Sequence, residues 1–227
     1  MSQIKAGKVE FKVAGRPVSG YMAAPIDGGP GVIVLHAWWG LNTFFNELCN
    51  RLAVQGFTAF APDLNQGKVA ETVDEAKVIM NERDFVFTGA VVAQSVEILR
   101  QQPGVRPGKL GVVGFSMGAS WALVLASQAP DDIAALVLFY GAEEVDFSRI
   151  HAACQGHFAE VDPWTPIEDA RRMEDDMRAA GLTPKFYIYP GTGHWFFEDN
   201  RLEDYNAAAA QLAWERMIAF LRDQIGG

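Results

Sequence analysis

Two short, uninterrupted apolar runs constrain the fold more than any other feature of this sequence. Residues 31–35 read Gly-Val-Ile-Val-Leu, and residues 110–114 read Leu-Gly-Val-Val-Gly. A strand with one face in water alternates polar and apolar residues, whereas a strand covered by helices on both faces is apolar throughout. After the first run, Phe45, Leu48 and Leu52 have the spacing of one buried helical stripe. The two runs therefore predict an α/β fold with a mostly parallel central sheet and helices on both faces.

The remaining strands are predicted from shorter segments that turn residues separate. Residues 8–13 and 17–23 alternate polar and apolar side chains around Ala14-Gly15-Arg16, which predicts a hairpin at a sheet edge with one wet face. Four further strands are predicted at residues 57–61, 133–140, 156–161 and 185–189.

Helices are predicted between these strands. Residues 69–102 have a helical pattern with a break near Asp84, and this pattern fits either one bent helix or two. Residues 165–168, Thr-Pro-Ile-Glu, have the form of a capping box with proline at the first helical position, which predicts a helix ending at Gly181. The last helix has its apolar face on Ala209, Leu212, Ala213, Met217, Phe220 and Leu221.

Composition limits the class of protein. The 227 residues fit one α/β domain, so we predict a single domain over residues 1–227. A formal net charge of −9, without any cluster of Lys and Arg, argues against nucleic acid as a partner. No segment reaches the roughly 18 apolar residues that span a bilayer, and residues 1–5 lack the apolar core of a signal peptide. We therefore expect a cytoplasmic protein without membrane contact.

The cysteine and histidine patterns give no support for a metal. Cys49 falls on a helical apolar stripe and Cys154 is the only other cysteine, so buried thiols are expected rather than a disulfide. The sequence has neither a CxxC pair nor an HExxH motif. We predict neither a metal site nor a cofactor.

Residues 114–118, Gly-Phe-Ser-Met-Gly, match G-x-S-x-G, the strand-to-helix turn that exposes a nucleophile in α/β-hydrolases. The pentapeptide lies between an apolar strand and a helix of small residues, as this chemistry requires. Ser116 is therefore the predicted nucleophile. The alternative is a serine that only caps the helix from Met117 to Ser127.

A serine hydroxyl needs a base, usually histidine. In this fold the order along the chain is nucleophile, acid, base, with the base after the last strand. Only His194, in a glycine-rich loop, satisfies that order. The other three histidines are assigned to core or solvent-facing positions: His36, His151 and His157.

The acid must lie between serine and histidine, at the end of a strand. Asp162 follows a predicted strand directly, and Pro163 with the helix behind it would fix the carboxylate. Three acids after the preceding strand are rivals for this role: Glu143, Glu144 and Asp146.

An oxyanion needs two converging N–H donors, commonly the residue after the nucleophile and one on an earlier loop. We predict Met117 and Trp38 for these positions. Trp39, Trp164 and Trp195 lie, like Trp38, on loops predicted at one edge of the sheet. This placement predicts a largely apolar substrate pocket.

These residues together resemble the dienelactone hydrolase family, over nearly the whole chain. The similar blocks are Ala37-Trp38-Trp39-Gly40-Leu41-Asn42, Phe57-Thr58-Ala59-Phe60-Ala61-Pro62-Asp63-Leu64, the pentapeptide at 114–118, Gly156-His157-Phe158-Ala159-Glu160-Val161-Asp162, and Gly193-His194-Trp195-Phe196-Phe197. The resemblance implies the α/β-hydrolase fold, and the family's acid aligns with Asp162.

Three positions depart from the best-known members of this family. Those members have a cysteine nucleophile, a glutamate in the earlier loop that readies the thiol, and an arginine after the catalytic histidine that binds a substrate carboxylate. This sequence has Ser116, Ala37 and Glu198 at these positions. The first two changes are mutually consistent with a hydroxyl activated by histidine, and the third favours an uncharged substrate.

The sequence therefore predicts a serine hydrolase that cleaves a small ester or lactone through Ser116, His194 and Asp162 by way of an acyl-enzyme. We expect a monomer or small homo-oligomer whose partner is the small-molecule substrate. One alternative is another acyl chemistry on the same residues, either acyl transfer or amide cleavage. The other is a non-catalytic scaffold that binds a ligand.

Overall fold

A computed structural model describes residues 3–226. Met1, Ser2 and Gly227 lie outside this range. They belong to the predicted domain at 1–227, and the first two also belong to the N-terminal segment on which the predicted location depends. The chain divides into two compact units, Met1–Leu110 and Gly111–Gly227, and each is described by itself. Among the described residues, no helix is long and apolar enough to cross a membrane.

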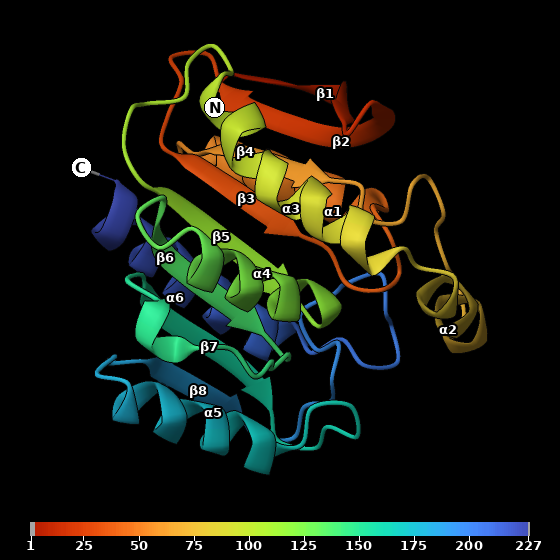
Figure 1. Ribbon diagram of the computed structural model, residues 1–227. Helices are drawn as coiled ribbons and strands as arrows, with labels where there is room; N and C mark the ends of the chain where they lie inside the picture. Colours follow the sequence, from red (N-terminus) through yellow and green to blue (C-terminus); the bar gives the residue numbers. More distant parts are fainter. Residues whose placement is uncertain (1–2, 227) are drawn as a thin grey trace. The chain divides into compact units, whose positions relative to one another are not determined.

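The strands of the first unit begin with an antiparallel hairpin. Along the sheet they follow the order β1-β2-β4-β3, in which β2 and β4 are antiparallel and β3 and β4 are parallel (Figure 1). Ala14 and Gly15 form the hairpin turn with φ angles of 48° and 80°. The strands β1 and β2 are longer than the strands predicted at 8–13 and 17–23, mainly at the ends away from the turn. The bounds are β1 Ile4–Val13, β2 Arg16–Pro25, β3 Gly31–Leu35 and β4 Thr58–Pro62.

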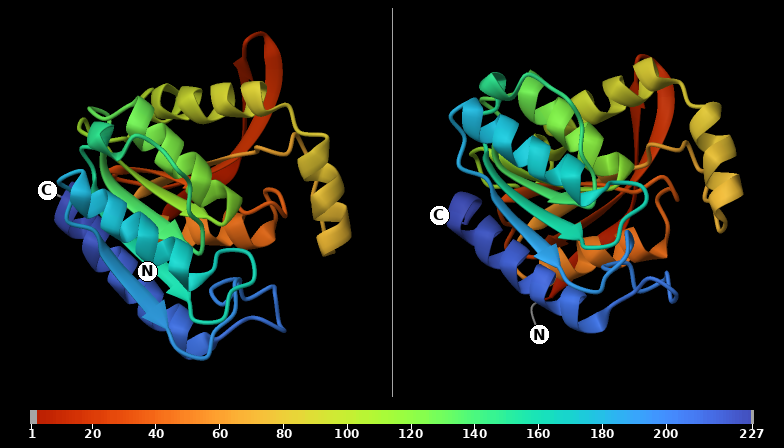
Figure 2. Two further views of the ribbon diagram at one scale, coloured as in Figure 1. Left: turned by 60° about the horizontal axis from the view of Figure 1, so that its bottom comes forward. Right: turned by 90° about the horizontal axis from the view of Figure 1, so that it is seen from below.

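Helices cover both faces of these strands. Figure 2 shows α1 and α3 on opposite sides of them, and the predicted stripe of α1 is buried, Cys49 included. The helical pattern at 69–102 resolves into two helices, because the Asp84 side chain accepts a hydrogen bond from Phe87 N at 2.9 Å and begins a new helix there. The bounds are α1 Thr43–Val54, α2 Val73–Asn81 and α3 Phe85–Arg100.

The strands of the second unit follow the order β5-β6-β7-β8, and the pairs β6–β7 and β7–β8 are parallel. Their bounds are β5 Leu110–Phe115, β6 Ile133–Phe139, β7 Ala153–Ala159 and β8 Lys185–Tyr189. The strand predicted at 156–161 is therefore shifted. It ends at Ala159, and Val161, with 68% of its surface exposed, belongs to the following loop.

The helices of the second unit also cover both faces of its strands. In Figure 2, α4 and α5 lie on one side and α6 lies on the other. The helical bounds are α4 Met117–Gln128, α5 Ile167–Ala179 and α6 Ala207–Ile225, with a short 3-10 helix at Phe147–Arg149. Helices on both faces of the sheet, as the apolar runs predicted, are thus confirmed within each unit.

The predicted capping box at the start of α5 is wrong. The helix begins at Ile167 with Pro166 in the cap position, and no side chain caps it. The Thr165 hydroxyl instead donates to the carbonyl of Tyr140 at 3.1 Å. A tertiary hydrogen bond to the end of β6 has replaced the local bond that the sequence pattern suggested.

Candidate active site

Ser116 lies at a sharp turn between β5 and α4. Its backbone has φ 52° and ψ −116°, a conformation that a residue with a Cβ rarely adopts. The turn is held because Ser116 N donates to Phe139 O at 2.9 Å and Ala119 N donates to Ser116 O at 2.8 Å. A Cβ at Gly114 would lie 2.3 Å from the carbonyl oxygen of Gly118, so the turn requires glycine there.

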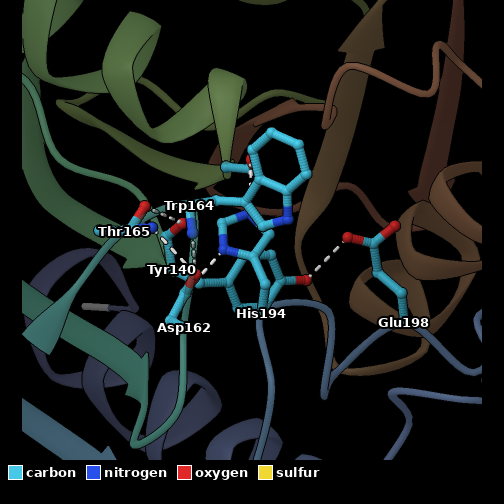
Figure 3. Close-up of polar contacts among 7 residues, drawn as sticks. Tyr140, Asp162, Trp164, Thr165, His194 and Glu198 are labelled. Atoms are coloured by element: carbon cyan, nitrogen blue, oxygen red, sulfur yellow. Dashed lines mark hydrogen bonds and ion pairs between the residues drawn. The ribbon is translucent and has the colours of Figure 1, made fainter. Parts of the chain in front are cut away.

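The structure joins the three predicted side chains in one hydrogen-bonded chain. The Ser116 Oγ lies 2.8 Å from His194 Nε2, and His194 Nδ1 lies 2.7 Å from Asp162 Oδ2 (Figure 3). Ser116 occupies the N-cap position of α4 but its side chain makes no capping bond, which argues against the alternative that it only caps the helix. His194 and Asp162 are both buried, with 3% and 8% of their surfaces exposed.

Two backbone N–H groups hold the Asp162 carboxylate in place. Its Oδ1 accepts hydrogen bonds from Trp164 N at 2.8 Å and Thr165 N at 2.9 Å, while Oδ2 faces His194. Figure 3 shows these bonds together with the bond from Asp162 to His194. A carboxylate fixed in this way accepts the Nδ1–H of the imidazole and leaves the Nε2 lone pair for the serine hydroxyl.

The loop that carries the acid is bonded to the loop that carries the base. Val161 N donates to Thr192 O at 3.1 Å, and Gly191 N donates to the Glu160 carboxylate at 2.9 Å. The two loops follow β7 and β8, which are adjacent parallel strands. This is why two residues 32 positions apart in the chain meet in space.

The rival residues are placed elsewhere. Glu143, Glu144 and Asp146 are exposed, and the Asp146 carboxylate accepts from Ser148 N. His36 and His157 are fully buried, and His151 is exposed beside Asp131. Burial lowers the pKa of His36 to about 4 and that of His157 to about 3, so both imidazoles are uncharged at neutral pH.

The structure adds two residues to this site that the sequence did not indicate, Tyr140 and Glu198. Tyr140 follows β6, and its ring centroid lies 5.0 Å from that of His194. Its hydroxyl donates to Glu198 Oε1 at 2.9 Å. A tyrosine at the end of a strand is common, and Glu198 stood out only as a departure from the family pattern. Nothing in the sequence pattern at either position indicated that these residues would surround His194.

The residues predicted for the oxyanion site lie in different units. Met117 is the first residue of α4, and Trp38 lies on the loop after β3. Within the first unit this loop is held by Asn65 Nδ2, which donates to Trp38 O at 3.0 Å, and by Ala70 N, which donates to Trp39 O at 2.9 Å. The pairing of the two donors remains a prediction.

The tryptophans predicted to line a pocket differ in exposure. Trp39 is 2% and Trp195 8% exposed, whereas Trp164 is 44% exposed and has its ring centroid 6.1 Å from that of Trp195. In the part of the chain that the structure describes, no three His, Cys, Asp or Glu side chains gather in a way that could hold a metal ion.

A solved structure closely resembles this chain. The crystal structure of a putative dienelactone hydrolase from Klebsiella pneumoniae has a TM-score of 0.86 and 26% sequence identity, covering 96% of this chain and 98% of that chain. The predicted class, an α/β-hydrolase with a mostly parallel sheet, is thereby confirmed.

Sequence comparisons define the family. Residues 18–225 match the model of the dienelactone hydrolase family. The chain is 35% identical over 226 residues to protein usf of Aquifex pyrophilus, covering 96% of this chain and 98% of the relative. It is 30% identical over 223 residues to a putative carboxymethylenebutenolidase of Aquifex aeolicus, covering 94% and 96%. The chain therefore belongs to the dienelactone hydrolase family, and the prediction of a hydrolase of this kind is confirmed.

Proposed function

We propose that this protein is a serine hydrolase that cleaves a small, uncharged ester or lactone through an acyl-enzyme on Ser116. One observation carries the proposal. The hydroxyl of Ser116, the imidazole of His194 and the carboxylate of Asp162 form a continuous chain of hydrogen bonds of 2.8 and 2.7 Å. This order of groups is the arrangement that turns a weakly nucleophilic hydroxyl into an attacking group.

In the proposed reaction, His194 Nε2 takes the proton of the Ser116 hydroxyl as Oγ attacks the carbonyl carbon. Asp162 stabilises the imidazolium that forms and keeps its Nδ1 directed inward. His194 then gives the proton to the leaving alcohol oxygen, and water, activated by the same imidazole, releases the acid. The N–H groups of Met117 and Trp38 are the proposed donors to the oxyanion, each worth about 3 kcal/mol of the barrier.

The environment of Glu198 supports an uncharged substrate. The family's best-known members have an arginine at this position, whereas Glu198 is fully buried and bonded to Tyr140. It supplies no positive charge for a substrate carboxylate. The exposed ring of Trp164, two residues from Asp162, adds apolar surface next to the site.

Labelling with a fluorophosphonate tests the nucleophile. We expect the wild-type protein to be labelled and Ser116→Ala to remain unlabelled. Ser120→Ala is the matched control, because Ser120 lies one turn further along α4 and its hydroxyl donates to Ala142 O rather than to a histidine. Labelling of the Ser120 variant should equal that of wild type. If the wild-type protein is not labelled, the non-catalytic scaffold is the better interpretation.

A pair of lactones with the same ring, one neutral and one carrying a carboxylate, tests the substrate class. We expect a higher kcat/KM for the neutral compound, and a preference for the anionic one would overturn this part of the proposal. Product analysis in the presence of an added alcohol or amine separates hydrolysis from acyl transfer. The small-molecule substrate as partner and the cytoplasmic location are proposed from the sequence alone.

A further inference from the structure

We propose that Tyr140 and Glu198 act together as positioning residues that hold His194 between Ser116 and Asp162. The inference rests on the proposed function, since it concerns the geometry of the same three side chains. It starts from the position of Tyr140, which contacts the loop of the acid and the loop of the base, while the next residue, Gly141, lies against the backbone of Ser116. Figure 3 shows the first two of these contacts.

The side chain of Tyr140 contacts two residues of the loop that carries the base, His194 and Glu198. Its ring lies against the His194 imidazole with centroids 5.0 Å apart, and its hydroxyl donates to Glu198 Oε1 at 2.9 Å. His194 and Glu198 are four residues apart on one loop. The phenol therefore contacts this loop at two points, and its hydrogen bond to Glu198 fixes where the ring meets the imidazole.

The backbone of Tyr140 supports the acid. Its carbonyl accepts a hydrogen bond from the Thr165 hydroxyl at 3.1 Å, and Thr165 N donates to Asp162 Oδ1 at 2.9 Å. One residue at the end of β6 is thus connected by hydrogen bonds to the carboxylate and by ring contact to the imidazole. A displacement of Tyr140 would change the distance between the two partners.

The backbone at Tyr140 and Gly141 has an unfavourable conformation at Tyr140 and lies next to the backbone of Ser116. Tyr140 has a φ of 37°, and its N–H donates to His157 O at 2.8 Å. A Cβ at Gly141 would lie 2.4 Å from Ser116 O, so the segment passes close to the serine backbone. A bulky residue in the left-handed region is strained, and such strain persists mainly at functional sites.

Glu198 suits this role because it is uncharged at neutral pH. Burial raises its pKa to about 8, an effect that the hydrogen bond from Tyr140 and the charge of Arg201 offset only in part. Its second oxygen, Oε2, is buried and makes no hydrogen bond within the described residues. A neutral carboxyl can accept the phenol hydrogen without adding a second negative charge beside the Asp162–His194 pair.

The first test removes only the phenol hydroxyl. In Tyr140→Phe we expect kcat for an aryl ester, and the rate of fluorophosphonate labelling, to fall about tenfold while KM changes less than twofold, because misplacement of a base affects the reaction step. Tyr189→Phe is the matched control. Tyr189 is also a buried tyrosine of this unit, and its hydroxyl bonds to His157 instead of a residue of the site. Its activity should stay within twofold of wild type.

The second test addresses Glu198. Glu198→Leu removes the acceptor and should lower kcat as Tyr140→Phe does, and the double variant should be no slower than either single one, since both break the same bond. Glu198→Gln keeps an acceptor oxygen and no charge, so it should retain activity within about twofold of wild type. If Glu198→Leu does not fold, Tyr140→Phe and Glu198→Gln decide the matter.

The outcomes separate this inference from the proposed function. Wild-type protein that is not labelled overturns the proposed function and this inference with it. Labelled wild-type protein with an unchanged Tyr140→Phe variant overturns this inference alone. An equal loss in Tyr189→Phe also overturns it, because the effect would then follow from losing any buried phenol hydroxyl.

Discussion

His157 and His194 are both buried in the second unit, and each ring uses both nitrogens, yet their partners differ. His157 bonds to the Tyr189 hydroxyl at 2.8 Å and to Gln155 Oε1 at 3.0 Å. His194 bonds to the Asp162 carboxylate and to the hydroxyl of Ser116. Two neutral partners leave His157 as an uncharged structural group. A carboxylate on one side and a serine hydroxyl on the other make His194 a candidate base.

The comparison teaches that burial alone does not produce a base. Burial lowers the pKa of His157 to about 3, so the ring cannot hold a proton at neutral pH. A general base must accept a proton during the reaction and return it, which requires a group that stabilises the imidazolium. Of these two buried histidines, only His194 has a carboxylate among its hydrogen-bond partners, whereas His151, which lies beside Asp131, is exposed.

The largest expected effect comes from exchanging each histidine for glutamine. His194→Gln should reduce kcat for an aryl ester by about 10⁵-fold or more, because the serine loses its base. His157→Gln should leave kcat within threefold and lower the midpoint of thermal unfolding, since two buried hydrogen bonds are disturbed. Steady-state kinetics and thermal melts of both variants measure this difference. Equal losses of kcat would contradict the comparison.

The next largest effect concerns the Asp162 carboxylate, which is a hydrogen-bond partner of His194 but not of His157. Asp162→Asn keeps the shape of the side chain but removes its charge, so kcat should fall by about 10⁴-fold. Glu144→Gln is the control, because Glu144 is an exposed acid on the loop after β6, and kcat should change less than twofold. A large loss in Glu144→Gln with little loss in Asp162→Asn would move the acid to that loop.

A smaller effect appears in the pH dependence of stability. The folded-state pKa of Glu198 is about 8, above its ordinary value of 4.5, so the folded protein holds this proton where the unfolded chain has lost it. The stabilisation is fully present below pH 4.5 and is lost as pH rises through 8, at up to about 1.4 kcal/mol per unit. Urea unfolding of wild type and Glu198→Gln between pH 5 and 8 should therefore show wild type losing stability relative to the variant. If the difference in unfolding free energy between wild type and Glu198→Gln stays constant over this pH range, the raised pKa of Glu198 is refuted.

The smallest effect comes from giving His157 a carboxylate partner. In Gln155→Glu the new carboxylate lies beside His157 Nε2 and should raise the pKa of that imidazole above its wild-type value of about 3. The ring-proton shifts of histidine in NMR spectra recorded against pH measure this change. Turnover should stay within twofold, because His157 bonds to Tyr189 and Gln155 and not to Ser116. An unchanged titration would show that burial, and not the partner, controls this ring.

Much of the fold follows from local patterns in the sequence. Continuous apolar runs mark β3 and β5 because a strand covered on both faces has no place for polar side chains. The glycines around Ser116 mark the turn because a Cβ at residue 114 would collide with the helix that follows. The order of Ser116, Asp162 and His194 along the chain indicated the triad, since the fold places each after a particular strand.

Other features depended on which loops become neighbours in space. The end of β7 at Ala159, the loss of the predicted cap at Thr165 and the contacts of Tyr140 all arise where the loops after β6, β7 and β8 meet. The sequence alone determined the periodicities, the turn and the residue types, because these depend on near neighbours in the chain. Only the tertiary structure decided that residues 140, 165 and 198 surround His194. Their contacts follow from the order of strands in the sheet, which no local pattern encodes.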